Sequence, residues 1–65
     1  SVALQKDRYK LTYYTATDYD FFELYDLEID PDELNDIFES RPAIAKPMQR
    51  ELLANLKRVN QVNQK

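Results

Sequence analysis

The 65-residue sequence contains no cysteine, histidine, glycine or tryptophan. Without cysteine, neither a disulfide framework nor a thiolate metal site can compensate for the small core of so short a chain. Histidine and cysteine are the side chains most often used as general base or nucleophile near neutral pH. Glycine-rich phosphate loops are excluded as well, because the backbone needs glycine where it approaches such a ligand. We therefore predict a protein that is not an enzyme, with no catalytic residue and no cofactor.

Long apolar runs are also missing, since the longest span only two or three residues, far below the ~20 needed to cross a bilayer. The chain starts at Ser1 and no basic-then-apolar signal sequence follows, which indicates a processed protein or an excised fragment. These features predict an intracellular, cytoplasmic protein, or a nuclear one in a eukaryotic host. Hydrophobic residues make up 43% of the chain and charged residues 32%, which leaves open whether the module folds alone or on binding a partner.

The charged residues are separated into three blocks along the chain. Residues 1–10 carry a net charge of +2, residues 11–40 carry ten acidic and no basic side chains, and residues 41–65 carry a net charge of +5. Blocks of like charge repel internally and are often interaction segments. Two interpretations remain open. Either the basic block folds back on the acidic block of the same chain, or one of the blocks binds an oppositely charged partner.

The local pattern predicts a single strand near the N-terminus, over residues 8–15. Tyr9, Leu11 and Tyr13 alternate with polar or aromatic neighbours, which is the period of a half-buried strand. Residues 1–7 are expected to form a flexible start.

Residues 18–27 fit two structures. Phe21, Leu24 and Tyr25 recur at helical spacing behind an acidic first turn, which favours a helix. The alternative is a second strand that pairs with residues 8–15 in a hairpin, because Phe21 and Tyr25 also share one face of an extended chain.

A helix over Pro31–Glu39 follows from its capping residues. Asp30 is a good N-cap, Pro31 suits the first helical position, and Glu33 can reach back to the cap. The same acidic stretch resembles the first half of a calcium loop. Pro31 stands where that loop needs glycine, however, and Ile37 stands where it needs a bidentate glutamate, so we predict no metal site.

Two prolines predict a connector over residues 40–46 and a last helix over 47–60, with a frayed tail over 61–65. One side of this helix is apolar and would serve as a homodimer seam through Met48, Leu52, Leu56 and Val59. The other side is basic. The predicted fold is thus a small, mainly helical (α+β) single domain over residues 1–65, with one N-terminal strand followed by two or three short helices.

The acidic-aromatic segment, residues 18–39, carries the main functional prediction. Bulky apolar side chains interleaved with acids are typical of surfaces that bind a basic partner protein. We predict a protein–protein interaction module, acting as adaptor, inhibitor or regulator. The expected partner contacts are Asp18, Tyr19, Asp20, Phe22, Glu23, Tyr25 and Asp26.

The basic side of the last helix supports an alternative function, a small dimeric regulator that binds nucleic acid through phosphate contacts. The expected contacts are Lys46, Arg50, Lys57 and Arg58. The acidic net charge of −3 argues against this alternative.

Overall fold

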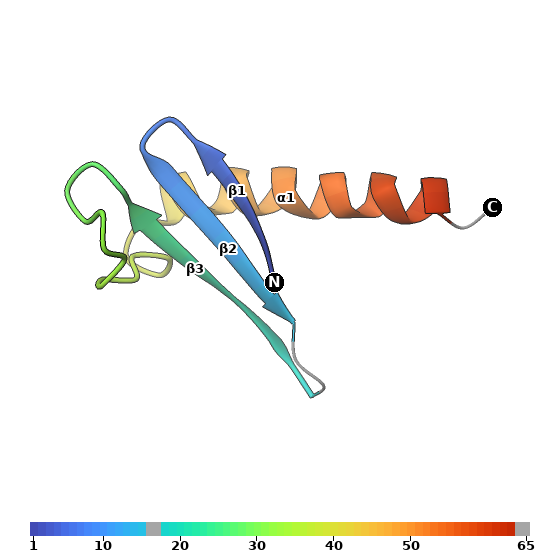
Figure 1. Ribbon diagram of the computed structural model, residues 1–65, viewed down its shortest axis with the longest axis horizontal. Coiled ribbons are helices and arrows are strands. Elements are labelled where there is room, and N and C mark those ends of the chain that lie inside the picture. The colour runs from blue at the N-terminus through green and yellow to red at the C-terminus, as the bar shows by residue number, and fades with distance from the viewer. Residues whose placement is uncertain (16–17, 64–65) are drawn as a thin grey trace.

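Three antiparallel strands and one long helix make up the described part of the chain, residues 1–15 and 18–63 of the computed structural model. The strands β1 (Val2–Lys6), β2 (Tyr9–Thr15) and β3 (Asp20–Asp26) form one sheet in the order β1-β2-β3. The helix α1 (Pro42–Asn63) lies across one face of this sheet (Figure 1). The predicted mainly helical fold, with one strand followed by two or three short helices, is therefore wrong.

β1 occupies most of the segment that was predicted to be a flexible start. It forms because its apolar side chains alternate in step with those of β2, so that Leu4 lies opposite Leu11. Asp7 and Arg8 join the two strands, with Asp7 at φ 57° in the left-handed region. That region favours glycine, but aspartate tolerates it better than most residues do. A tight hairpin therefore forms in a chain that has no glycine.

β2 occupies the segment where alternation predicted a strand, and β3 stands where a helix was favoured over residues 18–27. The hairpin alternative is the structure that forms. Its register places Tyr13 opposite Phe22 and Tyr14 opposite Phe21, with ring centroids 4.5 and 4.9 Å apart. Such cross-strand aromatic pairs contribute about 0.2–1 kcal/mol each. If residues 18–27 were a helix, neither of these two aromatic pairs could form.

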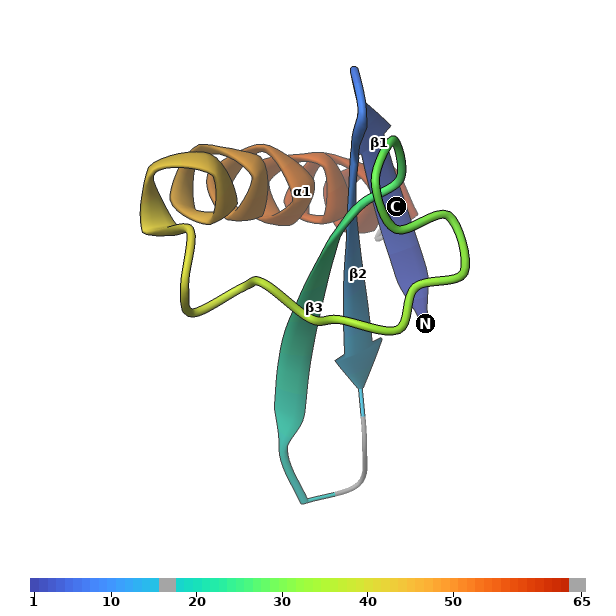
Figure 2. The same cartoon turned by 90° about the vertical axis from the view of Figure 1, so that its left-hand side faces the viewer.

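The helix predicted over Pro31–Glu39 does not form either. The carboxylate of Asp30 accepts backbone hydrogen bonds from Leu34 and Asn35, both at 3.0 Å, as a cap would. The following residues do not continue as a helix. They run along the outer edge of β3 and cover it (Figure 2). The backbone N–H of Ile37 donates to the Leu24 carbonyl at 2.8 Å, and the Leu24 N–H donates to Asp36 Oδ1 at 2.9 Å. The hydrogen bonds to the edge of β3 stabilise the chain more than a short helix would, because an isolated helix of this length is marginally stable.

α1 begins at Pro42 and runs through the predicted connector over residues 40–46. The Arg41 carbonyl accepts hydrogen bonds from Ile44 and Ala45, so Pro42 occupies the first helical position, where no N–H is needed. Pro47 lies inside the helix instead of starting it. The helix also continues past the predicted end at residue 60, and residues 64–65 of the expected frayed tail lie outside the described residues. In the described part of the chain no helix has the length and apolar character to cross a membrane.

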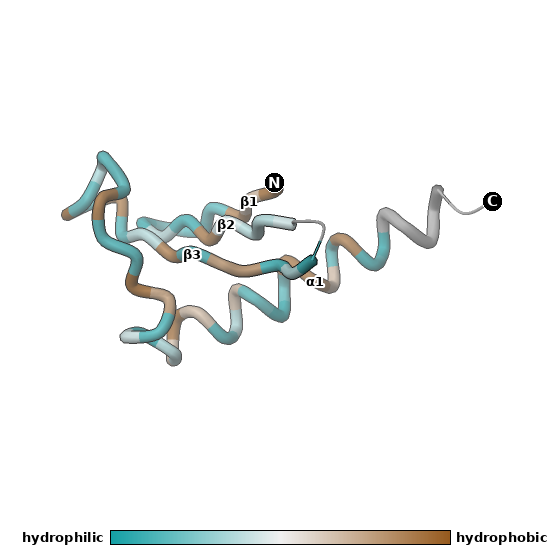
Figure 3. Tube along the Cα trace, turned by 90° about the horizontal axis from the view of Figure 1, so that it is seen from below, coloured by the Kyte–Doolittle hydropathy of each residue, from teal (hydrophilic) through white to brown (hydrophobic). Residues whose placement is uncertain are grey.

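The core lies between α1 and the sheet face that carries Leu11 and Leu24, which are both fully buried. Ala45, Met48 and Leu52 close the core from the helix side. Figure 3 shows the sheet and α1 as two layers. Two faces therefore point outward on opposite sides of the fold: the open face of the sheet, and the solvent face of α1.

Candidate functional site

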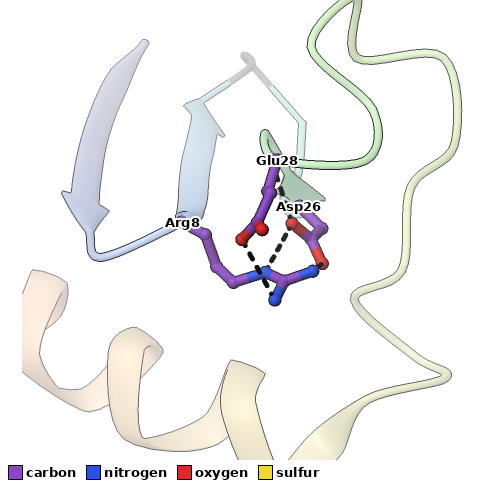
Figure 4. A network of polar contacts seen from close by, with 3 residues as sticks. All are labelled: Arg8, Asp26 and Glu28. Atoms are coloured by element: carbon purple, nitrogen blue, oxygen red, sulfur yellow. Dashed lines mark hydrogen bonds and ion pairs between the residues drawn. The ribbon is translucent and has the colours of Figure 1, made fainter.

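An ion-pair network joins the β1–β2 turn to the end of β3 (Figure 4). Arg8 Nε donates to Asp26 Oδ1 at 2.9 Å, and Arg8 Nη2 donates to Asp26 Oδ2 at 2.7 Å. Glu28 Oε1 lies 3.1 Å from Arg8 Nη1. The Arg8 guanidinium lowers the pKa of Asp26, and the backbone N–H of Glu28 acts in the same direction. Asp26 is only 6% exposed, so this predicted partner contact is engaged within the chain.

A second polar network lies on the open face of the sheet. The hydroxyl of Tyr25 donates to Glu23 Oε1 at 2.6 Å, and Lys10 Nζ donates to Glu33 Oε2 at 2.8 Å. The hydrogen bond to Glu23, together with burial, raises the pKa of Tyr25. Tyr25 is only 7% exposed. This predicted aromatic anchor is therefore part of the fold and is not presented to a partner.

Three rings gather at the hairpin end of the open sheet face, and we call them the aromatic surface: Tyr14, Tyr19 and Phe21. Phe21 stacks on Tyr14, and the ring centroids of Tyr19 and Phe21 are 5.9 Å apart. Tyr19 is 67% exposed and Phe21 is 39% exposed. Tyr19 is the one predicted anchor that the fold leaves largely in solvent. Tyr14 and Phe21 were missed, because only the hairpin brings them onto one face.

The remaining predicted contacts are distributed over both sides of the sheet. Phe22 is half-buried on the helix side, where it stacks between Tyr13 and Phe38. Asp20 accepts a hydrogen bond from the Tyr13 hydroxyl, and this bond raises the pKa of Tyr13. Asp18 is exposed, whereas Glu23 is half-buried. The predicted set of seven residues therefore does not form one continuous surface.

The solvent face of α1 carries a line of cations, which we call the basic stripe: Lys46, Arg50 and Lys57. All three are exposed, on the side of the helix that faces away from Met48 and Leu52. None of the ion pairs between the described side chains involves any of them. Arg58, also predicted as a contact, lies about 100° further round the helix, where its guanidinium donates to the Asn55 amide oxygen.

The residues predicted for a homodimer seam lie mostly against the sheet of the same chain. Met48 and Leu52 are buried in the core, and Leu56 is half-buried beside them. The side chain of Val59 lies outside the described part of the chain.

Two shallow grooves flank the N-terminal half of α1. The first, of about 370 Å³, is lined by Phe38, Glu39, Pro42, Ala45, Lys46 and Gln49. The second, of about 280 Å³, includes Tyr9 and Pro47, and the ion pair between Lys6 and Glu51, 3.0 Å long, lies at its rim. Over residues 1–15 and 18–63, no group of three or more acidic, histidine or cysteine side chains is placed to hold a metal ion.

One protein family matches this chain. The model of the family described as N-sulphoglucosamine sulphohydrolase, C-terminal, matches residues 1–62. The chain belongs to this family. Neither the curated proteins nor the solved structures gave a match. The matched residues include the whole sheet, the segment that covers β3 and all but the last residue of α1, so the match extends over both layers of the fold.

Membership in a sulphohydrolase family overturns the functional prediction. The chain was predicted to be non-enzymatic, an adaptor, inhibitor or regulator, with a nucleic-acid regulator as the alternative, and these predictions are wrong. The prediction that the chain is not an enzyme relied on the missing histidine and cysteine. The lack of histidine and cysteine limits only the chemistry that these 65 residues can carry out themselves. The family description, in contrast, names the C-terminal part of a hydrolase. The acidic and basic blocks therefore need to be interpreted as surfaces of an enzyme.

Proposed function

We propose that this chain acts as the C-terminal region of an enzyme that hydrolyses the sulphate group from N-sulphoglucosamine. The observation that carries the proposal is the family match over residues 1–62. In this proposal the chain supplies a folded layer of the enzyme, and the reacting groups come from the rest of the polypeptide. The absence of histidine and cysteine from the sequence supports this division of roles, because hydrolases most often use these side chains as bases or nucleophiles.

The aromatic surface is the part of the chain best suited to contact the rest of the enzyme. It lies on the sheet face that α1 does not cover, and the rings of Tyr19 and Phe21 remain in solvent. Exposed aromatic rings gathered in one place are typical of contact surfaces. The stacked pair of Tyr14 and Phe21 stiffens this surface, because each ring is held by the opposite strand.

The test is complementation within the polypeptide that carries this chain. Removing residues 1–63 should abolish the release of sulphate from an N-sulphoglucosamine glycoside, and adding the chain as a separate polypeptide should restore it. The variant Phe21→Ala should restore it poorly. Leu34→Ala truncates a side chain that is 83% exposed but is not part of the aromatic surface, and it should restore sulphate release fully. Full sulphate release from the truncated polypeptide alone would contradict the proposal.

A further inference from the structure

We propose that the basic stripe of α1 binds the sulphate groups of a sulphated glucosamine oligosaccharide, so that the C-terminal region helps to hold an extended anionic substrate. This inference rests on the proposed function. It assigns a binding role to Lys46, Arg50 and Lys57, which lie on the side of α1 opposite the core.

The three cations are aligned along the helix. Lys46 and Arg50 are one turn apart, and Lys57 is two turns further on, so the stripe extends over about 16 Å at 1.5 Å per residue. A single small anion would contact only one or two of these side chains. An extended polyanion that runs along the helix would contact all three.

None of the ion pairs between the described side chains joins the stripe to an acid, although Glu39 lines the same groove as Lys46. Glu51 is the one acidic side chain of α1, and it is turned toward β1, where it pairs with Lys6 at 3.0 Å. The ten acids of residues 11–40 lie on β3 and on the segments before and after it. An anionic ligand is therefore attracted to the stripe and repelled from the segments that carry these acids.

The uncharged neighbours of the stripe suit a sugar better than a nucleic acid. Leu53 lies between Arg50 and Lys57 on the same face, where it is 41% exposed and offers an apolar contact to the C–H face of a sugar ring. The stripe contains no aromatic ring on which a base could stack, which is the usual device for binding single-stranded nucleic acid.

The first experiment measures the affinity of the full polypeptide that carries this chain for an N-sulphated glucosamine hexasaccharide. The triple variant Lys46→Gln, Arg50→Gln, Lys57→Gln should lose about ten-fold or more in affinity, and the slope of log affinity against log salt should fall by about one for each cation removed. Arg58→Gln is the matched control, since it removes one positive charge from another side of the same helix and should change affinity less than two-fold. Circular dichroism establishes that each variant remains folded.

Three results would overturn the inference: equal affinity in the triple variant and the unmodified protein, an equal effect of Arg58→Gln and Arg50→Gln, or a DNA duplex of the same charge binding as tightly as the hexasaccharide. A kinetic readout separates this inference from the proposed function. The triple variant should raise the ratio of the KM for the hexasaccharide to the KM for a monosaccharide glycoside by about ten-fold. If the unmodified polypeptide released no sulphate from either substrate, the proposed function would fail, while the affinity measurement would still decide the binding role of the stripe.

Discussion

Arg8 and Asp26 hold the turn between β1 and β2 against the end of β3 through two parallel hydrogen bonds of 2.9 and 2.7 Å. The Leu27 N–H donates to the Arg8 carbonyl at 2.7 Å and strengthens the same junction. Paired geometry of this kind is the strongest form of an arginine–carboxylate contact. The junction connects the β1–β2 turn with the last residue of β3, which lies opposite Tyr9 at the start of β2.

This junction predicts an acid-sensitive contribution to stability. Because the pKa of Asp26 is lowered in the folded protein, its contribution is fully present above the unfolded pKa of about 3.9 and is lost as the pH falls through the folded value. The difference in thermal midpoint between the unmodified protein and Asp26→Asn should therefore be largest above about pH 4 and shrink below it. Asp18→Asn, at an exposed carboxylate, is the matched control. A difference that stayed constant down to pH 2 would contradict the prediction.

The Leu24 side chain should be one of the two most costly apolar positions to truncate in the sheet, together with the equally buried Leu11. It is fully buried between β2 and α1, and Leu24→Ala should lower the free energy of unfolding by about 2–5 kcal/mol. Urea titration followed by circular dichroism gives this value. The same truncation at Leu34, which is 83% exposed, should change the free energy by less than about 0.5 kcal/mol. Similar losses at both positions would show that the core is not where the structure places it.

Pro47 should be a weak point of α1. It lies inside the helix, has no N–H to donate to the Ala43 carbonyl, and its ring crowds the preceding turn. Pro47→Ala should raise the free energy of unfolding by about 1–3 kcal/mol. Pro42→Ala is the control, because proline is well suited to the first helical position and its removal there should have little effect. A loss of stability in Pro47→Ala would mean that the ring's contacts in the groove beside Met48 outweigh the missing hydrogen bond.

Tyr25 should ionise only well above the usual pKa of a tyrosine as the pH is raised. Its hydroxyl is held by Glu23 at 2.6 Å in a buried position, and both effects raise its pKa. The associated stability is fully present below the unfolded pKa of about 10 and is lost as the pH rises above it. Ring resonances in an NMR titration should show Tyr25 shifting only above the usual titration range of a tyrosine. Tyr25→Phe should cost about 0.5–1.5 kcal/mol at neutral pH, and early ionisation of Tyr25 would contradict the hydrogen bond.

Local pattern was sufficient where one structure suited the residues much better than any other. Alternation of Tyr9, Leu11 and Tyr13 indicated the strand now seen as β2. The apolar and basic sides of the last helix likewise indicated which face carries Met48 and which carries Arg50. Both inferences rest on the fixed periods of strand and helix, which do not depend on distant residues.

Local pattern failed where two structures suited the residues equally well or where a distant group competed. Phe21 and Leu24 fit both a helix and a strand, and the cross-strand partners on β2 decided for the strand. Asp30 does cap the backbone that follows it, yet no helix continues, because Asp36 and Ile37 are needed at the edge of β3. The pair of Arg8 and Asp26 could be found only after the hairpin register was known.

The sequence by itself determined the separation of charge, the amphipathic character of the last helix and the lack of histidine and cysteine. Tertiary structure alone decided that α1 begins at Pro42, since packing of Ala45 and Met48 on the sheet compensates for a proline inside the helix. It also decided which rings are left in solvent. Burial depends on which strand lies opposite, and a strand's partner is chosen by contacts between residues far apart in the chain.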